Sequence, residues 1–466
     1  MFDSPPFRLF SPLAHTMASA HAQHSAAIFL PAITRDHTSS SLLDTSKLTT
    51  IRLKLKVSFK RIRQFWQTNS NHGDELLSSD LLKSKLQSIN FQNNVSIHNG
   101  RGKRLFPLFT LVKFENNVCV GLNGENGTCI AATECSQRSG ISSGVCASGY
   151  GVCCIVTVSC GETTSNNNSY FVNPNYPSTF DGTLSCQLTL AKSHPNVCQF
   201  RLDFIQFNIR GPETTNHQCV YDQFIVSGGN PVPTICGNNA ENHIYIDAGL
   251  GQTNPVTLTF VTSGHSFARS WKVRVSQIRC DSIYRSEEGC LLYFTGISGQ
   301  VKSFNYDSIT GLQLSNQDYS ICIRMERNFC GIQYMACPVD DKEGTMSSDS
   351  TSMAQMIRSN AFTLTGNTQA MQIASMVGTS CQTDWLMIPC AFNTGRLPTT
   401  VTTCTDRICG GTFNAENQNL NASSIVSTVK PFRLIFHTDS VEAPNDVGNK
   451  GFCLNYIQQP CTTKLR

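Results

Sequence analysis

The chain of 466 residues contains 22 cysteines, and all of them lie between Cys119 and Cys461. This density of cysteine is typical of a disulfide framework formed in an oxidising compartment, so we expect a secreted, extracellular protein. The alternative is a thiol-rich metalloprotein, but the Cys-x-x-Cys pairs of zinc ribbons are missing. The length suggests about three domains.

The region before the first cysteine differs from the rest of the chain in charge. Residues 1–118 carry 15 basic and 7 acidic side chains, a net charge of +8, whereas the remainder carries 21 basic and 25 acidic ones, a net charge of −4. The sum of +4 is too small to indicate a nucleic acid or an anionic membrane surface as a partner. Either two different parts are joined here or the first part is processed away.

We expect residues 1–118 to be poorly structured, and either removed from the mature protein or an error of the gene model. No signal peptide is evident, because the best apolar run, residues 26–33, is broken by Pro31. That run is too short to span a bilayer and no later one reaches 18 residues, so membrane insertion is not expected. Residues 51–63 alternate apolar and basic side chains, which fits an amphipathic strand, a transit-like segment or a solvated basic tail. Residues 101–104, Arg-Gly-Lys-Arg, match the pattern read by secretory processing proteases, so we expect cleavage after Arg104; a basic turn is the alternative.

Residues 119–154 contain six cysteines in a segment that is poor in large apolar side chains. About 36 residues cannot bury enough core to fold alone, so disulfides must stabilise this segment. The neighbours Cys153 and Cys154 should bond to two different partners, because a bond between them would be strained. Six cysteines that end in an adjacent pair resemble the clip domains of arthropod proteins. That resemblance implies the pairs Cys119–Cys153, Cys129–Cys146 and Cys135–Cys154, one of 15 possible pairings.

Clip domains usually precede trypsin-like proteases, yet we find no catalytic motif and do not expect an enzyme. A Gly-Asp-Ser-Gly-Gly stretch, a histidine in an Ala-Ala-His-Cys setting and a His-Glu-x-x-His zinc site are all missing. One Gly-x-Ser-x-Gly match, residues 140–144, lies between two cysteines of the small segment rather than on a strand-to-helix turn. The scattered histidines read as surface or structural residues: His194, His217, His243, His265 and His437.

From Cys160 onward, apolar residues alternate with polar ones in short segments separated by Gly, Pro and Asn. In residues 199–209 the apolar set is Phe200, Leu202 and Phe204, and then the phase slips at Ile205, which indicates a bulge or bend. The same alternation recurs in Val256, Leu258 and Phe260 and in Trp271, Val273 and Val275. Short strands of this kind predict an antiparallel sandwich.

Several motifs in residues 160–280 follow the order found in a CUB domain. They are Cys160, Asn-Pro-Asn-Tyr-Pro at 173–177, Cys186, the strand at 200–204, Cys-Val-Tyr-Asp at 219–222, Ile-Cys-Gly at 235–237 and Leu-Thr-Phe at 258–260. The resemblance implies a jelly-roll sandwich with the disulfides Cys160–Cys186 and Cys219–Cys236. Cys198 and Cys280 remain and are paired with each other.

Residues 281–462 read as a second, divergent copy. Ser-Phe-Asn-Tyr-Asp at 303–307 stands where 173–177 stood, residues 381–388 mirror 219–226, and 408–410 mirror 235–237. Phe432, Leu434 and Phe436 lead into Thr438 and Asp439, the Phe-x-Thr-Asp end of CUB domains. This register implies the pairs Cys290–Cys322, Cys330–Cys461 and Cys381–Cys409, with Cys337–Cys453 and Cys390–Cys404 as additions. Residues 341–380, rich in Ser, Thr and Met, look like a mobile loop insertion.

Many CUB domains bind calcium at one end of the sandwich, where carboxylates gather. In the first copy Asp222 is present, but Arg210 and Ser263 stand near the other ligand positions, so we expect a salt bridge and no calcium. In the second copy the resemblance implies calcium ligands at Asp384 and Asp439, with Asp340, Asp341 or Glu343 as the third. Two aspartates that cap loops are the alternative. No other cofactor is expected.

The predicted fold class is all-β, with two antiparallel jelly-roll sandwiches preceded by a small disulfide-rich module. Asn-x-Ser/Thr triplets predict N-glycans at Asn126, Asn167 and Asn421 and, less strongly, at Asn94. By resemblance to arthropod CUB-domain proteins, we expect a non-catalytic binding protein whose partner is an extracellular protein or a glycan. Two alternatives are a docking component of a protease system with its catalytic domain on another chain, and a structural matrix component, which would show low-complexity repeats.

Overall fold

The computed structural model describes residues 113–249, 255–338, 361–365, 374–395, 404–442 and 449–461. The expected cleavage site after Arg104 and the sequon at Asn94 lie outside these ranges, in residues 1–112. The described ranges belong to the second of two compact units, Pro107–Arg466. They form an all-β structure with one short α-helix, α3 (Ala132–Gln137), and they include no helix long and apolar enough to cross a membrane.

The first part of the described chain is the disulfide knot, residues 119–154. Its four strands are β1 (Val118–Val120), β2 (Asn126–Ile130), β3 (Ile141–Cys146) and β4 (Gly151–Val158). The adjacent cysteines bond to different partners, because Cys153 pairs with Cys119 and Cys154 pairs with Cys135. The third bridge joins Cys129 to Cys146.

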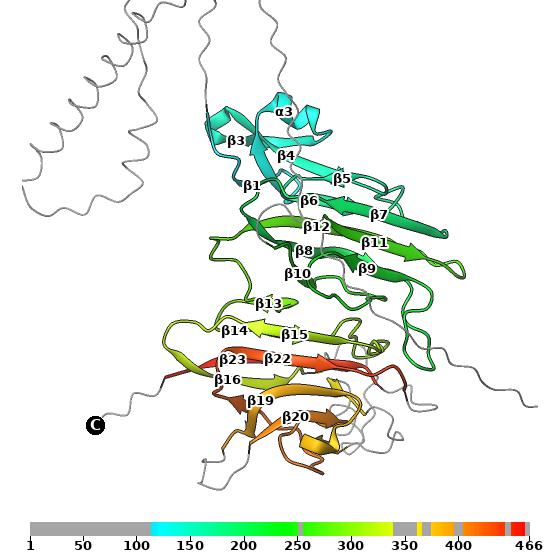
Figure 1. Cartoon of the computed structure of the whole chain (residues 1–466), viewed down its shortest axis with the longest axis vertical. Helices are drawn as coiled ribbons and strands as arrows, with labels where there is room; N and C mark the ends of the chain where they lie inside the picture. The colour runs from blue at the N-terminus through cyan, green and yellow to red at the C-terminus, as the bar shows by residue number, and fades with distance from the viewer. Residues whose placement is uncertain are drawn as a thin grey trace, which may run out of the picture. The chain divides into compact units, whose positions relative to one another are not determined.

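The knot is joined to the first sandwich by β4, which runs on from one into the other. Its C-terminal half pairs in parallel with β6 (Ser169–Val172), so that Val156 lies opposite Ser169. In Figure 1 the knot and these strands form one continuous sheet. Side chains tighten the junction: Lys272 pairs with Glu125, and the Tyr170 hydroxyl donates to the Asn126 carbonyl at 2.9 Å.

The first sandwich consists of two facing sheets. Its remaining strands are β5 (Thr163–Thr164), β7 (Leu184–Leu190), β8 (Val197–Asn208), β9 (Gln223–Ser227), β10 (His243–Asp247), β11 (Val256–Thr262) and β12 (Ser270–Arg279). One sheet continues from the knot in the order β4-β6-β12-β8-β10, and the other has the order β5-β7-β11-β9 (Figure 1). The pairs β4–β6 and β5–β7 are parallel, and the others are antiparallel.

Aromatic residues fill the space between these two sheets. The ring of Trp271 stacks on Phe260 with centroids 4.3 Å apart, and Phe204 and Phe207 pack nearby. The expected bulge is confirmed: Lys272 lies opposite Gln206 and Val273 opposite Phe204, so Ile205 has no partner in β12. Ile205 is 48% exposed, whereas Phe204 is buried.

The second sandwich is also built of two layers. Its strands are β13 (Leu292–Phe294), β14 (Ser298–Lys302), β15 (Asp318–Ile323), β16 (Phe329–Ala336), β17 (Phe362–Thr363), β18 (Ser375–Val377), β19 (Trp385–Asn393), β20 (Thr405–Gly410), β21 (Ile425–Ser427), β22 (Phe432–His437) and β23 (Gly451–Pro460). The sheet order is β13-β15-β22-β19-β21-β16-β23-β14. Strand β19 passes from one layer to the other, since its first half pairs with β22 and its last residues pair with β21.

Part of the segment expected to be a loop insertion, residues 341–380, forms strands instead. Strand β17 pairs with β23, and β18 pairs with β20. Phe362 and Leu364 are buried in the core, because their side chains complete the apolar interior of the second sandwich. Residues 341–360 and 366–373 lie outside the described ranges.

Eleven disulfides bind all 22 cysteines, and none is free. Each joins two cysteines that were paired in the sequence analysis. Outside the knot they are Cys160–Cys186, Cys198–Cys280, Cys219–Cys236, Cys290–Cys322, Cys330–Cys461, Cys337–Cys453, Cys381–Cys409 and Cys390–Cys404.

Candidate functional site

The end of the first sandwich carries a buried ion pair. The Asp222 carboxylate accepts hydrogen bonds from Arg269 Nε at 2.6 Å and Nη2 at 3.0 Å, and both side chains are almost fully buried. The expected partner Arg210 donates only its backbone N–H, at 2.8 Å, and its guanidinium lies over the ring of Tyr221 instead. The sequence therefore predicted a salt bridge at Asp222 but named the wrong arginine, because Arg269 lies just before β12 and 47 residues from Asp222 in the chain.

The corresponding end of the second sandwich brings Asp384 and Asp439 together through the backbone. Asp384 is buried, and its Oδ1 accepts the N–H of Asp439 at 3.0 Å. The carboxylate of Asp439 accepts the N–H of Val441 at 2.9 Å, which is the loop-capping role given as the alternative to calcium. Asp340, Asp341 and Glu343, the candidates for a third ligand, lie outside the described residues.

A second buried carboxylate, which the sequence analysis missed, lies beside Asp384. Gln313 Nε2 donates at 2.7 Å both to Asp384 Oδ2 and to Glu442 Oε1. Asn449 Nδ2 donates to Glu442 Oε2, also at 2.7 Å. Burial, and after it the charge of Glu442, raises the pKa of Asp384 to about 7. Glu442 follows the motif that ends at Asp439 by three residues, so no motif marked it.

The first sandwich supplies the fifth member of this group, which we call the interdomain polar cluster: His217, Gln313, Asp384, Glu442 and Asn449. The His217 ring is fully buried, with Nδ1 3.5 Å from Glu442 Oε1. Its backbone carbonyl accepts the N–H of Ser315 at 3.1 Å. This end of the second sandwich is therefore covered by a turn of the first.

The interdomain polar cluster does not fit a calcium ion on its own. It supplies only two carboxylates, Asp384 and Glu442, and each of their four oxygens already accepts a hydrogen bond from a protein N–H group. Calcium takes six to eight oxygen ligands. Within the described ranges, no three His, Cys, Asp or Glu side chains are placed to hold a metal ion.

Asn305 forms a second contact between the sandwiches. Its Oδ1 accepts the N–H of Asn238 at 3.1 Å, and its own N–H donates to Asn239 Oδ1 at 2.7 Å. The side chain lies so close to Gly237 that a Cβ there would be 2.0 Å from Asn305 Oδ1. Farther along, the N–H of Tyr245 donates to the Leu291 carbonyl at 2.8 Å, and His243 Nε2 lies 2.8 Å from the Tyr293 carbonyl.

The structure gives no support to a catalytic role for the Gly-x-Ser-x-Gly match. It lies in and beside β3 of the knot, where Ser142, the central serine of the match, lies opposite Cys154 of β4. No histidine hydrogen-bonds to Ser142 in the described ranges. His217 and His243 are buried structural residues, and His437 stacks on the ring of Trp385.

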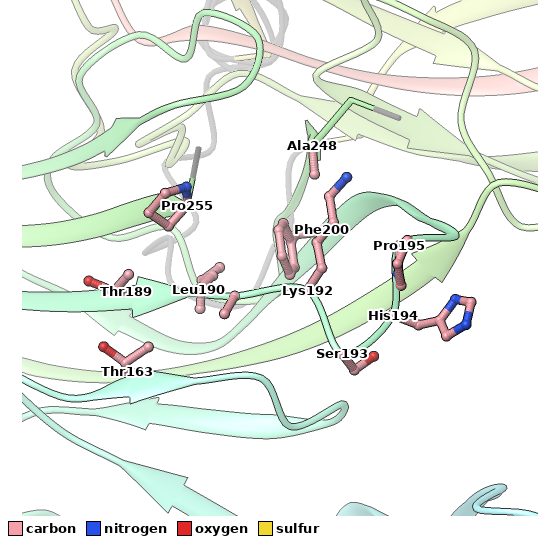
Figure 2. A pocket seen from close by; sticks show the side chains of 11 residues that line it. Thr163, Thr189, Leu190, Lys192, Ser193, His194, Pro195, Phe200, Ala248 and Pro255 are labelled. Atoms are coloured by element: carbon pink, nitrogen blue, oxygen red, sulfur yellow. The ribbon is translucent and has the colours of Figure 1, made fainter. Parts of the chain in front are cut away.

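A pocket of about 500 Å³ opens at one end of the first sandwich. Figure 2 shows Leu190 and Phe200 on its inner side, with the ring of His194 pointing away from them. Its wall is largely apolar, and Lys192, whose pKa is lowered by burial, donates to the Gly249 carbonyl. Residues 250–254, next to Ala248 and Pro255 in this wall, are not described, so we assign no ligand to the pocket.

A second hollow, the outer groove, has a volume of about 560 Å³ and crosses the outer face of the sheet formed by β8, β10 and β12. Its floor contains Arg201, Tyr245 and Arg274. It is also lined by Val118 and Asn126 of the knot, by Asn167, and by residues 281, 282 and 284.

The three sequons in the described ranges differ in their surroundings. Asn421 is exposed in a loop, whereas Asn126 and Asn167 are half-buried and both line the outer groove. Their glycosylation stays a prediction.

The disulfide knot exposes six large apolar side chains, although it spans fewer than 40 residues. Leu122 is the most exposed of them at 89%. The others are Val118, Val120, Ile141, Val145 and Tyr150. So many exposed apolar side chains in so short a segment make the knot a candidate contact surface.

Comparisons with known proteins match both sandwiches to one family. A family model for the CUB domain matches residues 160–275, and one for the animal CUB domain matches residues 287–459. Among curated proteins, a segment of 137 residues is 23% identical to cubilin of Sus scrofa and 26% identical to cubilin of Canis lupus familiaris. That segment is 28% of this chain and only 4% of the length of either cubilin.

Solved structures of CUB domains also match. The CUB1-EGF-CUB2 domains of rat MASP-1 are 13% identical, with 65% of this chain and 99% of that chain covered and a TM-score of 0.21. The MASP-1 CUB2 domain bound to Ca2+ is 20% identical, with 25% of this chain and 98% of that chain covered and a TM-score of 0.20. The two family models together match more than half of the chain, so the chain belongs to the CUB-domain family and contains two CUB domains.

Proposed function

We propose that the protein is a secreted, non-catalytic recognition protein that binds an extracellular protein or glycan through its CUB domains. The observation that carries this proposal is the presence of two CUB domains whose cysteines are all paired. Eleven disulfides form and persist only in an oxidising compartment, which supports secretion. Loops on a covalently stapled scaffold can present a binding surface at a low cost in entropy.

The proposal is tested on protein secreted from eukaryotic cells. Mass spectrometry without reduction should find the eleven bridges and a mature N-terminus close to residue 105. The same protein should bind a panel of extracellular proteins and glycans selectively, and a reduced and alkylated sample should not bind. Recovery of the native protein from cytosol with free thiols, or turnover of a substrate by the purified chain, would contradict the proposal.

A second candidate function is docking to an extracellular protease whose catalytic domain is on another chain. The exposed apolar side chains of the knot favour it, because the knot resembles the clip domains that accompany such proteases. The double variant Leu122→Ser and Val145→Ser should weaken binding to a trypsin-like zymogen at least tenfold, a loss of about 1.4 kcal/mol. The exposed pair Ile283→Ser and Ile309→Ser, which lies outside the knot, is the matched control. Equal affinities for the two double variants would rule out docking through these side chains.

Calcium in the second CUB domain is a separate proposal, with Asp384, Asp439 and Asp340 as its ligands. It rests on the positions of Asp384 and Asp439 in the CUB motifs. Isothermal titration with calcium should then give saturable binding that Asp439→Ala abolishes. If the titration gave no heat of binding and a chelator left the melting temperature unchanged, the proposal of calcium in this domain would be wrong.

A further inference from the structure

The outer groove has the chemistry of a saccharide site. Sugars are bound by polar groups that hydrogen-bond to hydroxyls and by aromatic rings that cover the apolar ring faces. The groove offers the guanidinium groups of Arg201 and Arg274, the hydroxyl of Ser276 and the ring of Tyr284, which is 64% exposed. Its volume of about 560 Å³ lies in the range of ligand pockets.

The charges in the floor leave hydrogen-bond donors available to a ligand. Arg201 and Arg274 share one carboxylate, Asp203, at 2.8 Å each. Burial opposes ionisation of Asp203, but the two guanidinium groups together hold its pKa below the ordinary value. Arg274 uses Nε and Nη2 in this contact, and its Nη1 makes no hydrogen bond within the described ranges.

Asn167, the acceptor residue of a sequon, lines this groove, and hydrogen bonds fix the orientation of its side-chain amide. Asn167 Oδ1 accepts the N–H of Gln277 at 2.8 Å and the N–H of Asn168 at 3.0 Å. These two bonds fix the plane of the amide and leave Nδ2, the atom that carries an N-glycan, without a hydrogen bond in the described ranges. Asn126, the acceptor of a second sequon, also lines the groove.

We propose that the outer groove holds the core of the protein's own N-glycan, attached at Asn167. The inference rests on the proposed secretion, because N-glycans are added in the secretory pathway. The glycan would pack between the knot and the segment that leads into the second CUB domain, with Tyr284 covering one sugar ring. It would thereby close the groove to other ligands.

The test is native deglycosylation with a peptide-N-glycosidase, followed at each site by mass spectrometry. Asn421 is exposed and serves as the internal reference. Release at Asn167 should be at least tenfold slower than at Asn421, equivalent to a docking free energy of about 1.4 kcal/mol. Tyr284→Ser should speed release at Asn167 and leave Asn421 unchanged. Tyr150→Ser removes a tyrosine of similar exposure outside the groove and should alter neither rate.

The outcomes separate the inference from the proposed function. Equal release rates at Asn167 and Asn421, or a glycan on Asn421 with none on Asn167, would overturn the docked glycan and leave secretion intact. A chain that carries no glycan at any site after expression in secreting cells would overturn the inference through the proposal on which it rests.

Discussion

At the scale of single residues, the structure shows how a buried charge is stabilised in one domain and left without a strong counter-charge in the other. The charge of Asp222 is balanced by Arg269. Asp384 instead lies buried beside a second carboxylate, Glu442, and both accept hydrogen bonds from the Gln313 amide. Burial without a cationic partner raises the pKa of a carboxylate, and the pKa of Asp384 is raised in this way. The two equivalent positions therefore have different electrostatics, although the motifs around them match.

Arg269→Met should destabilise the first CUB domain by about 3–5 kcal/mol, because it leaves the Asp222 carboxylate buried and unpaired. Arg210→Met, which keeps the backbone hydrogen bond to Asp222, is the control and should cost less than about 1 kcal/mol. Chemical denaturation of both variants measures the difference. A larger loss for Arg210→Met would show that the salt bridge is misassigned.

His243 should make the junction of the two domains sensitive to acid. Burial, and then the charge of Arg201, lowers its pKa from 6.5 to about 4 in the folded protein. As the pH falls below 6.5, His243 is protonated in the unfolded chain before it is protonated in the folded protein. The free energy of unfolding therefore decreases between pH 6.5 and 4, by as much as about 3 kcal/mol. Denaturation at several pH values should show a flatter pH dependence for His243→Gln than for the unaltered protein. Identical slopes over this range would exclude His243 as the cause.

At the scale of elements, alternation within a strand proved sufficient to predict which residues face the core and where β8 bulges. The phase slip at Ile205 was visible in the sequence because both flanking runs are regular. The cysteine pairs were implied by the resemblance to clip and CUB domains, and the cysteines left over were paired with each other. The strands β17 and β18 were missed, because their segment has the polar composition of a loop and finds its partners in distant strands.

The bulge predicts that substituting alanine for two neighbouring residues of β8 lowers the stability by different amounts. Phe204→Ala should cost about 3–5 kcal/mol, because it empties a site packed against Phe207 and Phe224. Ile205→Ala should cost less than about 1 kcal/mol, because the side chain is turned toward solvent. Thermal unfolding of the two variants makes the comparison, and similar losses would contradict the assigned register.

At the scale of the whole described unit, both CUB domains contribute polar groups to their junction, beside the packed rings of Tyr245 and Tyr293. His217 and Gly237 of the first domain meet Glu442 and Asn305 of the second. No pattern within one repeat could reveal them, because each depends on how two repeats meet. The two repeats allow a comparison, because Asn175 and Asn305 occupy equivalent motifs and have φ of 62° and 56°. Of these two residues, Asn305 is the one that hydrogen-bonds across the junction.

Asn305→Gly should therefore uncouple the unfolding of the two domains. Glycine tolerates the positive φ, so the variant removes the side chain with little backbone strain. Calorimetry should show one transition for the unaltered protein and two for Asn305→Gly. Asn175→Gly, at the exposed equivalent position, should keep the single transition. Two transitions in the unaltered protein would show that the junction is too weak to couple the domains.

The strand β4 has a consequence for how this protein can be divided and recombined. Its first half belongs to the knot and its second half to the sheet of the first CUB domain, so no boundary between them can be cut without losing a strand from one side. A fragment that starts at Cys160 would expose the bare edge of β6, which is a template for association with other chains. Exchange of the knot between proteins would thus require the recipient domain to accept a foreign strand into its own sheet.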